Sequence, residues 1–124
     1  IYERLKKISK YTSSDQIMFT LQERANLTRQ WRKFLFDYPL LLCPVSCSLP
    51  FDDLQDLKSE KDFEQIIEDQ ILQIGLPFVG LPGLTVTTDR KEDRPVGVQL
   101  VASHFREDIL LDAAKIIAPK FDAV

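Results

Sequence analysis

The first third of the chain carries apolar residues at helical spacing, three or four positions apart. Ser13 followed by Gln16 forms a capping-box signature, in which each residue can satisfy a backbone donor near the other. The pattern predicts a long helix from about Ser14 to Phe36. The stripe that would face its packing partner consists of Ile17, Leu21, Ala25, Thr28, Trp31 and Leu35.

A continuous apolar run, Tyr38–Cys43, follows this helix and stops at Pro44. It does not alternate between apolar and polar residues, as a half-exposed strand would. A continuous run is typical of a strand that is covered on both faces and has strand neighbours on both sides. Residues 45–53 have no periodicity and are expected to be irregular.

A second helix is predicted to begin at Ser59, because Asp62 stands three residues later. Gly75 is expected to end this helix. Residues 76–83 contain two prolines and two glycines among large apolar residues, which predicts a buried loop with fixed backbone angles. The narrow apolar stripe of the helix consists of Phe63, Ile66, Ile67, Gln70, Ile71 and Ile74.

Two strands are predicted at Leu84–Thr88 and Val96–Ala102, separated by a charged turn. The connection is too short for a parallel crossover, so the pair is expected to be antiparallel. Gln99 stands in the middle of the second strand, and if buried it needs a hydrogen-bonding partner. A last helix is expected from about Arg106 to Ala118, packing through Ile109, Leu110, Ala113, Ile116 and Ile117.

The order of these elements predicts the fold class. Three strands and three helices with apolar faces make a poor closed core. We therefore expect an α/β fold in which the chain forms part of a mixed β-sheet flanked by helices, the rest being supplied by residues upstream of Ile1.

Composition and charge exclude several classes of partner and site. The chain has 124 residues, of which 44% are hydrophobic, and a net charge of −3, so we expect no nucleic acid partner. The longest apolar run is too short to cross a bilayer, so no membrane is expected. Cys43 and Cys47 are too far apart in an extended segment for a disulfide, and two free thiols favour the cytoplasm. No metal site is expected, because the chain has one His and no metal-type cysteine pair.

Several motifs, in this order and spacing, resemble the C-terminal segment of the amidase-signature hydrolases. The resemblance covers roughly Gln22 to Ala118. The matching motifs are DYPLLLCP at 37–44, Gly-Leu-Pro-Gly at 80–83, PVGVQLVA at 95–102 and Phe-Arg-Glu-Asp at 105–108, followed by Leu110 and Leu111.

The resemblance implies a fold, an activity and a site. The whole chain, 1–124, would be the C-terminal portion of a single amidase-signature domain. That family hydrolyses carboxamides with a nucleophilic Ser, a second Ser on a cis peptide and a Lys, without a cofactor. Those groups precede this region, so we assign no catalytic residue here. The partners implied are a small-molecule amide and the remainder of the same enzyme; whether that enzyme is a homodimer stays open.

The resemblance also implies substrate-binding residues. Phe78, Val79 and Leu81 align with the loop that lines the acyl pocket, and Gln70 aligns with an Asp that helps hold the amino-acid substrate in the glutamyl-tRNA amidotransferase A subunits. A neutral amide cannot balance an ammonium group, so Gln70 favours a less polar amide. Two alternatives remain: a segment of such an A subunit, or a catalytically inactive binding module. Exposed hydrophobic strand edges argue against the second.

Overall fold

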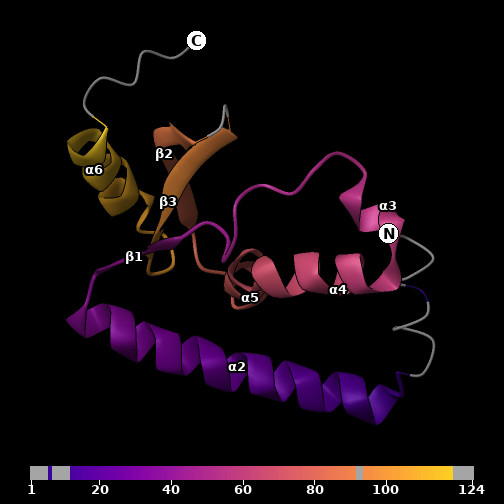
Figure 1. Cartoon of the computed structure of the whole chain (residues 1–124). Coiled ribbons are helices and arrows are strands. Elements are labelled where there is room, and N and C mark those ends of the chain that lie inside the picture. The colour runs from indigo at the N-terminus through magenta and orange to yellow at the C-terminus, as the bar shows by residue number, and fades with distance from the viewer. Residues whose placement is uncertain (1–5, 7–11, 92–93, 119–124) are drawn as a thin grey trace.

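The computed structural model describes residue 6 and residues 12–91 and 94–118 (Figure 1). A small antiparallel sheet lies between one helix on one side and a layer of helices on the other. In chain order the elements are α2 (Ser14–Asp37), β1 (Leu40–Pro44), α3 (Gln55–Lys58), α4 (Glu60–Asp69), α5 (Ile71–Phe78), β2 (Gly83–Lys91), β3 (Arg94–Ala102) and α6 (Glu107–Ile117). The α/β class predicted from the sequence is confirmed.

The sheet has the strand order β1-β3-β2, and both pairings are antiparallel. Leu84 pairs with Leu100 across the predicted hairpin, which confirms its antiparallel arrangement. The strands run closer to the turn than expected, to Lys91 and from Arg94, and the turn residues 92–93 lie outside the described part of the chain. β1 pairs with β3 alone among the described residues. The prediction of a second neighbour for β1 stays a prediction.

Alternate residues of β3 pack into two hydrophobic clusters on opposite faces of the sheet. Leu100 and Ala102 pack with Val86 of β2 and Leu110 of α6. Val101 points the other way, and its cluster joins the sheet to α2 and α5. This division is the one that the alternation in the sequence predicts. The second cluster consists of Leu35, Leu76, Val79, Leu81 and Val101.

The start of α2 follows the sequence pattern. The Ser13 hydroxyl accepts from the Gln16 backbone N–H at 3.2 Å, and the Gln16 side chain accepts from the Ser13 backbone N–H at 2.8 Å. The capping box is therefore complete. The packing stripe is only partly buried, because Ile17 and Leu21 are each 50% exposed while Leu35 is buried.

The second predicted helix differs from the structure in two ways. It breaks at Gln70 into α4 and α5, and Gly75 lies inside α5 instead of ending it. The helix ends at Phe78, and Gly80, two residues later, has the φ of 77° that gives the left-handed turn. Gly80 N donates to Pro77 O at 3.0 Å and Leu81 N to Leu76 O at 3.2 Å, the two bonds of a Schellman motif. Burial of Leu76 and Leu81 in one cluster explains why the helix passes Gly75.

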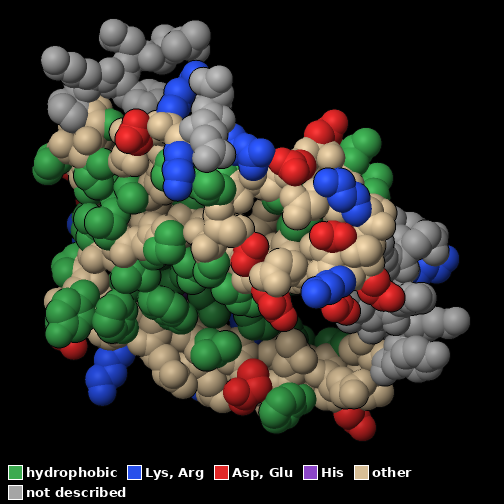
Figure 2. Space-filling view, viewed as in Figure 1, with side chains coloured by type: hydrophobic (Ala, Val, Ile, Leu, Met, Phe, Trp, Pro, Cys, Tyr) green, Lys and Arg blue, Asp and Glu red, His purple; other side chains and the backbone are tan. Residues whose placement is uncertain are grey.

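On the face seen in Figure 2, apolar and charged side chains gather over different elements. Figure 2 shows hydrophobic side chains gathered over the part that holds β1 and α6, and charged side chains over α3 and α4. Ile116 was predicted to pack and is instead 81% exposed. No helix in the described part of the chain is long and apolar enough to cross a membrane.

Candidate functional site

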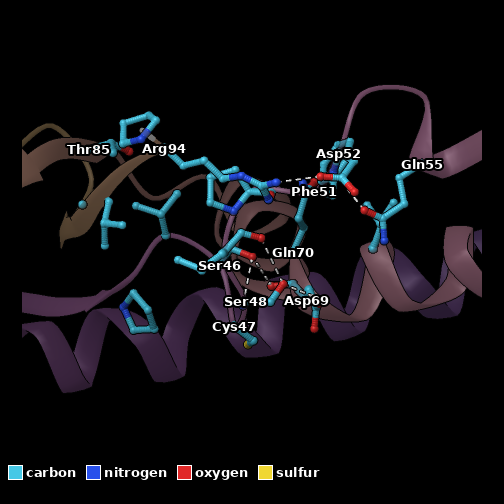
Figure 3. Close-up of a pocket in the computed structure, with 18 of the residues that line it drawn as sticks. Ser46, Cys47, Ser48, Phe51, Asp52, Gln55, Asp69, Gln70, Thr85 and Arg94 are labelled. Carbon is cyan, nitrogen blue, oxygen red and sulfur yellow. Dashed lines mark hydrogen bonds and ion pairs between the residues drawn. The ribbon is translucent and has the colours of Figure 1, made fainter. Parts of the chain in front are cut away.

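A cleft of about 1120 Å³ lies between the sheet and α4 (Figure 3). The irregular stretch after β1 forms one side. The α4–α5 junction forms the second side, and the start of β3 with the middle of β2 forms the third. Its polar lining includes Ser46, Ser48, Asp52, Gln55, Gln65, Asp69, Gln70, Thr85, Thr87 and Arg94.

Residues 45–52, here called the wall segment, are held at one end by Asp69. The Asp69 backbone carbonyl accepts from Cys47 N at 2.8 Å and from the Ser46 hydroxyl at 3.2 Å. Its carboxylate accepts from the Ser48 hydroxyl at 2.6 Å and from the Gln65 amide at 3.2 Å. One residue at the end of α4 thus fixes three consecutive residues of the wall segment.

Arg94 holds the other end of the wall segment. Its Nη1 donates to Pro50 O at 2.6 Å, and its Nη2 forms an ion pair with Asp52 at 2.7 Å. Asp52 N donates in turn to the Gln55 side chain at 2.9 Å, at the beginning of α3. These contacts are here called the clasp, and those of Asp52 with Arg94 and with Gln55 are visible in Figure 3. The ion pair is partly exposed, so salt is expected to weaken it.

Two glutamine side chains connect the wall segment to the sheet. Gln73 of α5 donates to Val45 O at 3.0 Å and to the Gln99 side-chain oxygen at 3.3 Å. Gln99 is buried, and the sequence prediction that a buried Gln99 needs a partner is confirmed. Gly83 lies against this amide, because a Cβ there would stand 2.9 Å from Gln99 Nε2.

The chemistry of the cleft is that of a binding surface. Its described lining offers hydroxyl, amide and carboxylate groups beside apolar side chains, and its one cation, Arg94, is committed to the clasp. No His or Lys stands among the described lining residues to activate a hydroxyl. Within the described ranges no group of three or more His, Cys, Asp or Glu residues is arranged to hold a metal ion.

The predicted site residues do not gather in one place. Gln70 lines the cleft, at the junction of α4 and α5. Val79 and Leu81 are buried in the core, 3% and 7% exposed, where they face α2 and β3. Phe78 ends α5 with its side chain 40% exposed, and its carbonyl accepts from Arg24 Nε at 2.6 Å. The substrate-binding role of all four stays a prediction.

The residues that hold the wall segment were missed in the sequence. Arg94 and Asp52 are 42 positions apart, and no local sequence pattern predicts that they pair. Ser46 and Ser48 stand in a stretch without periodicity, which indicated only a loop. The one available signal is the pair of prolines, Pro44 and Pro50, that bound the segment and restrict its backbone.

One buried nitrogen lacks a partner in the described structure. His104 Nε2 lies 3.1 Å from Val79 O, while His104 Nδ1 is buried with no hydrogen-bonding partner among the described residues. Buried polar atoms are nearly always paired in folded proteins. This nitrogen can therefore take a donor or acceptor from outside the described ranges.

Comparison with known proteins gives a consistent result. The sequence model of a family described as Amidase matches residues 2–111. Indoleacetamide hydrolases of Bradyrhizobium diazoefficiens and Bradyrhizobium japonicum are 36% and 34% identical over 90 residues, or 72% of this chain. The A subunit of the glutamyl-tRNA(Gln) amidotransferase of Streptococcus thermophilus is 29% identical over 93 residues, or 75% of this chain. The matched region covers only 17%, 19% and 18% of these three relatives.

Proposed function

This chain belongs to the amidase family, and from that premise we propose that it forms the C-terminal part of an enzyme that hydrolyses the C–N bond of a carboxamide. In this proposal the chain supplies fold and substrate pocket. The Ser, cis-Ser and Lys groups that break the bond stand elsewhere in the enzyme. The observation that carries the proposal is the match to amidases over most of this chain but less than a fifth of each relative.

Two features of this chain support the proposal that it is part of a larger protein. β1 has a free edge within the described structure, and Leu42 in its middle is 58% exposed. Free apolar edges invite further strand pairing. A second such feature is the buried Nδ1 of His104, which has no hydrogen-bonding partner among the described residues. We propose that the remainder of the same enzyme covers both.

The cleft supports an amide substrate of low polarity. Gln70 offers an amide at the position where a carboxylate would be needed to balance an ammonium group, and the cation of the cleft is neutralised by Asp52. Neither feature favours a charged ligand. The substrate for which the two hydrolases are named, indoleacetamide, is a neutral carboxamide with an aromatic acyl group and fits this chemistry. The two free thiols, Cys43 and Cys47, suit a reducing compartment such as the cytoplasm.

A second candidate is a glutamyl-tRNA amidotransferase A subunit, favoured by the 29% identity to that protein. It would require an acidic group for the substrate ammonium. Gln70 cannot provide one, while Asp69 beside it is engaged by Ser48 and Gln65. We therefore rank this candidate second.

Ammonia release by the purified protein that contains this chain separates the two candidates. Indole-3-acetamide and L-glutamine are offered at equal concentrations, and kcat/KM is measured for each. The hydrolase proposal expects the aromatic amide to be the better substrate by at least about tenfold, which corresponds to about 1.4 kcal/mol of transition-state binding. A preference for glutamine would favour the amidotransferase.

A further inference from the structure

The wall segment, residues 45–52, is attached to the body of the protein at its two ends by different kinds of contact. At the Asp69 end the contacts come from α4 and from Gln73 of α5, and they include two bonds to one backbone carbonyl. At the far end, Asp52 is bonded to Gln55 of α3, and a single side chain, Arg94, makes both contacts to β3. A single change at Arg94 can therefore release this end from the sheet.

The clasp also decides the shape of the cleft. Arg94 crosses from the sheet to the wall segment, and Asp52 continues the connection to Gln55 of α3 (Figure 3). Arg94, Pro50 and Asp52 all line the cleft. If the guanidinium is removed, the wall segment keeps its Asp69 contacts and loses its attachment to β3, so the cleft widens on that side.

We propose that Arg94 is a positioning residue, which through Pro50 and Asp52 holds the wall segment against the sheet and so shapes the pocket for an uncharged amide. The inference rests on the proposed function for its substrate and on the geometry of the clasp for its mechanism. Arg94 does not contact the reacting atoms in this proposal. Its guanidinium is suited to the task because its planar fork can reach a carbonyl and a carboxylate at once.

The first test follows the wall segment without requiring activity. Hydrogen exchange of a peptide covering residues 45–52 is measured by mass spectrometry in the unmodified protein and in Arg94→Gln. Loss of an exposed ion pair together with a charged hydrogen bond is expected to speed exchange by roughly threefold to tenfold. Arg90→Gln is the matched control, because Arg90 lies in the same hairpin and its backbone N–H, bonded to Asp89, is unaffected by the change of side chain.

The second test uses turnover of indole-3-acetamide by the same proteins. Arg94→Gln is expected to raise KM by roughly fivefold with kcat within about twofold, since loss of uniform binding raises KM alone. Salt should have the same effect as the substitution. Raising the NaCl concentration from about 0.05 M to 0.5 M should increase the KM of the unmodified protein and leave the KM of Arg94→Gln unchanged. Arg94→Lys, which keeps one charged contact, should restore part of the loss.

The outcomes separate the two proposals. Equal exchange in Arg94→Gln and Arg90→Gln would overturn the clasp, whatever the activity. Faster exchange with an unchanged KM would show that the wall segment moves but does not shape the pocket, and would overturn the positioning role. If the unmodified protein releases no ammonia from any amide, the proposed function fails, and the exchange measurement still decides whether Arg94 holds the wall segment.

Discussion

Gly97 in β3 is the position where the structure makes its sharpest prediction about a single atom. A Cβ built there would lie 2.5 Å from Val86 O, 3.1 Å from Val86 C and 3.2 Å from the Cα of Thr87. All three atoms are backbone of β2, so no side chain can turn away to make room. Gly97→Ala therefore has to push β2 away from β3, beside the cleft that both strands line.

The expected cost follows from overpacking. An extra methyl group in a tightly packed site costs about 1–3 kcal/mol, and the reduced freedom of the unfolded chain returns about 0.5 kcal/mol. The net loss should be about 1.5 kcal/mol. Gly75→Ala is the matched control, because a Cβ there meets nothing within 4 Å and Gly75 lies inside α5. That change should stabilise the protein by about 0.5–1 kcal/mol.

Native-state hydrogen exchange is the suitable assay, because it reports on local openings as well as on global unfolding. A loss of about 1.5 kcal/mol corresponds to roughly tenfold faster exchange of the β2 and β3 amides. In Gly75→Ala the amides of α5 should instead exchange a few times more slowly. Exchange in Gly97→Ala at or below the rate of the unmodified protein would refute the reasoning, since the two strands would then lie farther apart than described.

Two further predictions concern the cysteines and the larger core cluster. Burial raises the pKa of the Cys43 thiol, so at neutral pH its thiolate fraction is below that of an ordinary cysteine, and iodoacetamide should modify the exposed Cys47 first. Peptide mapping across a pH series should show Cys43 following only at higher pH; equal rates at neutral pH would contradict this. Leu35→Ala should cost about 2–5 kcal/mol by leaving a cavity between α2 and the sheet, measured as faster exchange in both. Lys33→Ala, exposed on the same helix, should change stability by less than about 0.5 kcal/mol, and an equal effect of both would argue against the cluster.

Local sequence signals predicted the elements whose causes are local. Ser13 and Gln16 predict the start of α2 because a capping box needs only residues three positions apart. The alternation in Val96–Ala102 predicts which residues face α6 and which face α2, because strand geometry sends neighbours to opposite sides. The same alternation places Gln99 on the face of Val101, while its burial is known only from the structure.

Features that depend on tertiary packing could not be predicted from the sequence. Both Gly75 and Gly80 are of a residue type that often terminates a helix. The helix continues past Gly75 to the turn at Gly80, because this brings Leu76 and Leu81 into one buried cluster. Ile116 stands at helical spacing but is exposed, whereas Ala113, Ala114 and Ala118 pack against the cluster around Leu110.

The cleft is the clearest case of a feature built from distant residues. The wall segment has no periodicity, and its position follows from Asp69 and Arg94, which lie far from it along the chain. Of the four residues proposed from the family resemblance, only Gln70 lines this cleft. The sequence predicted the family and most elements, whereas the shape of the candidate site required the structure.

The most direct test of the central proposal is ammonia release from indole-3-acetamide, measured side by side for the purified protein that contains this chain and for residues 1–124 produced alone. If the chain supplies pocket and fold but not the bond-breaking groups, the larger protein should turn over the amide and the separate chain should show no rate above background. Turnover by the separate chain would contradict the assignment of the catalytic groups elsewhere. Absence of turnover of any carboxamide by the larger protein would contradict the amidase activity itself.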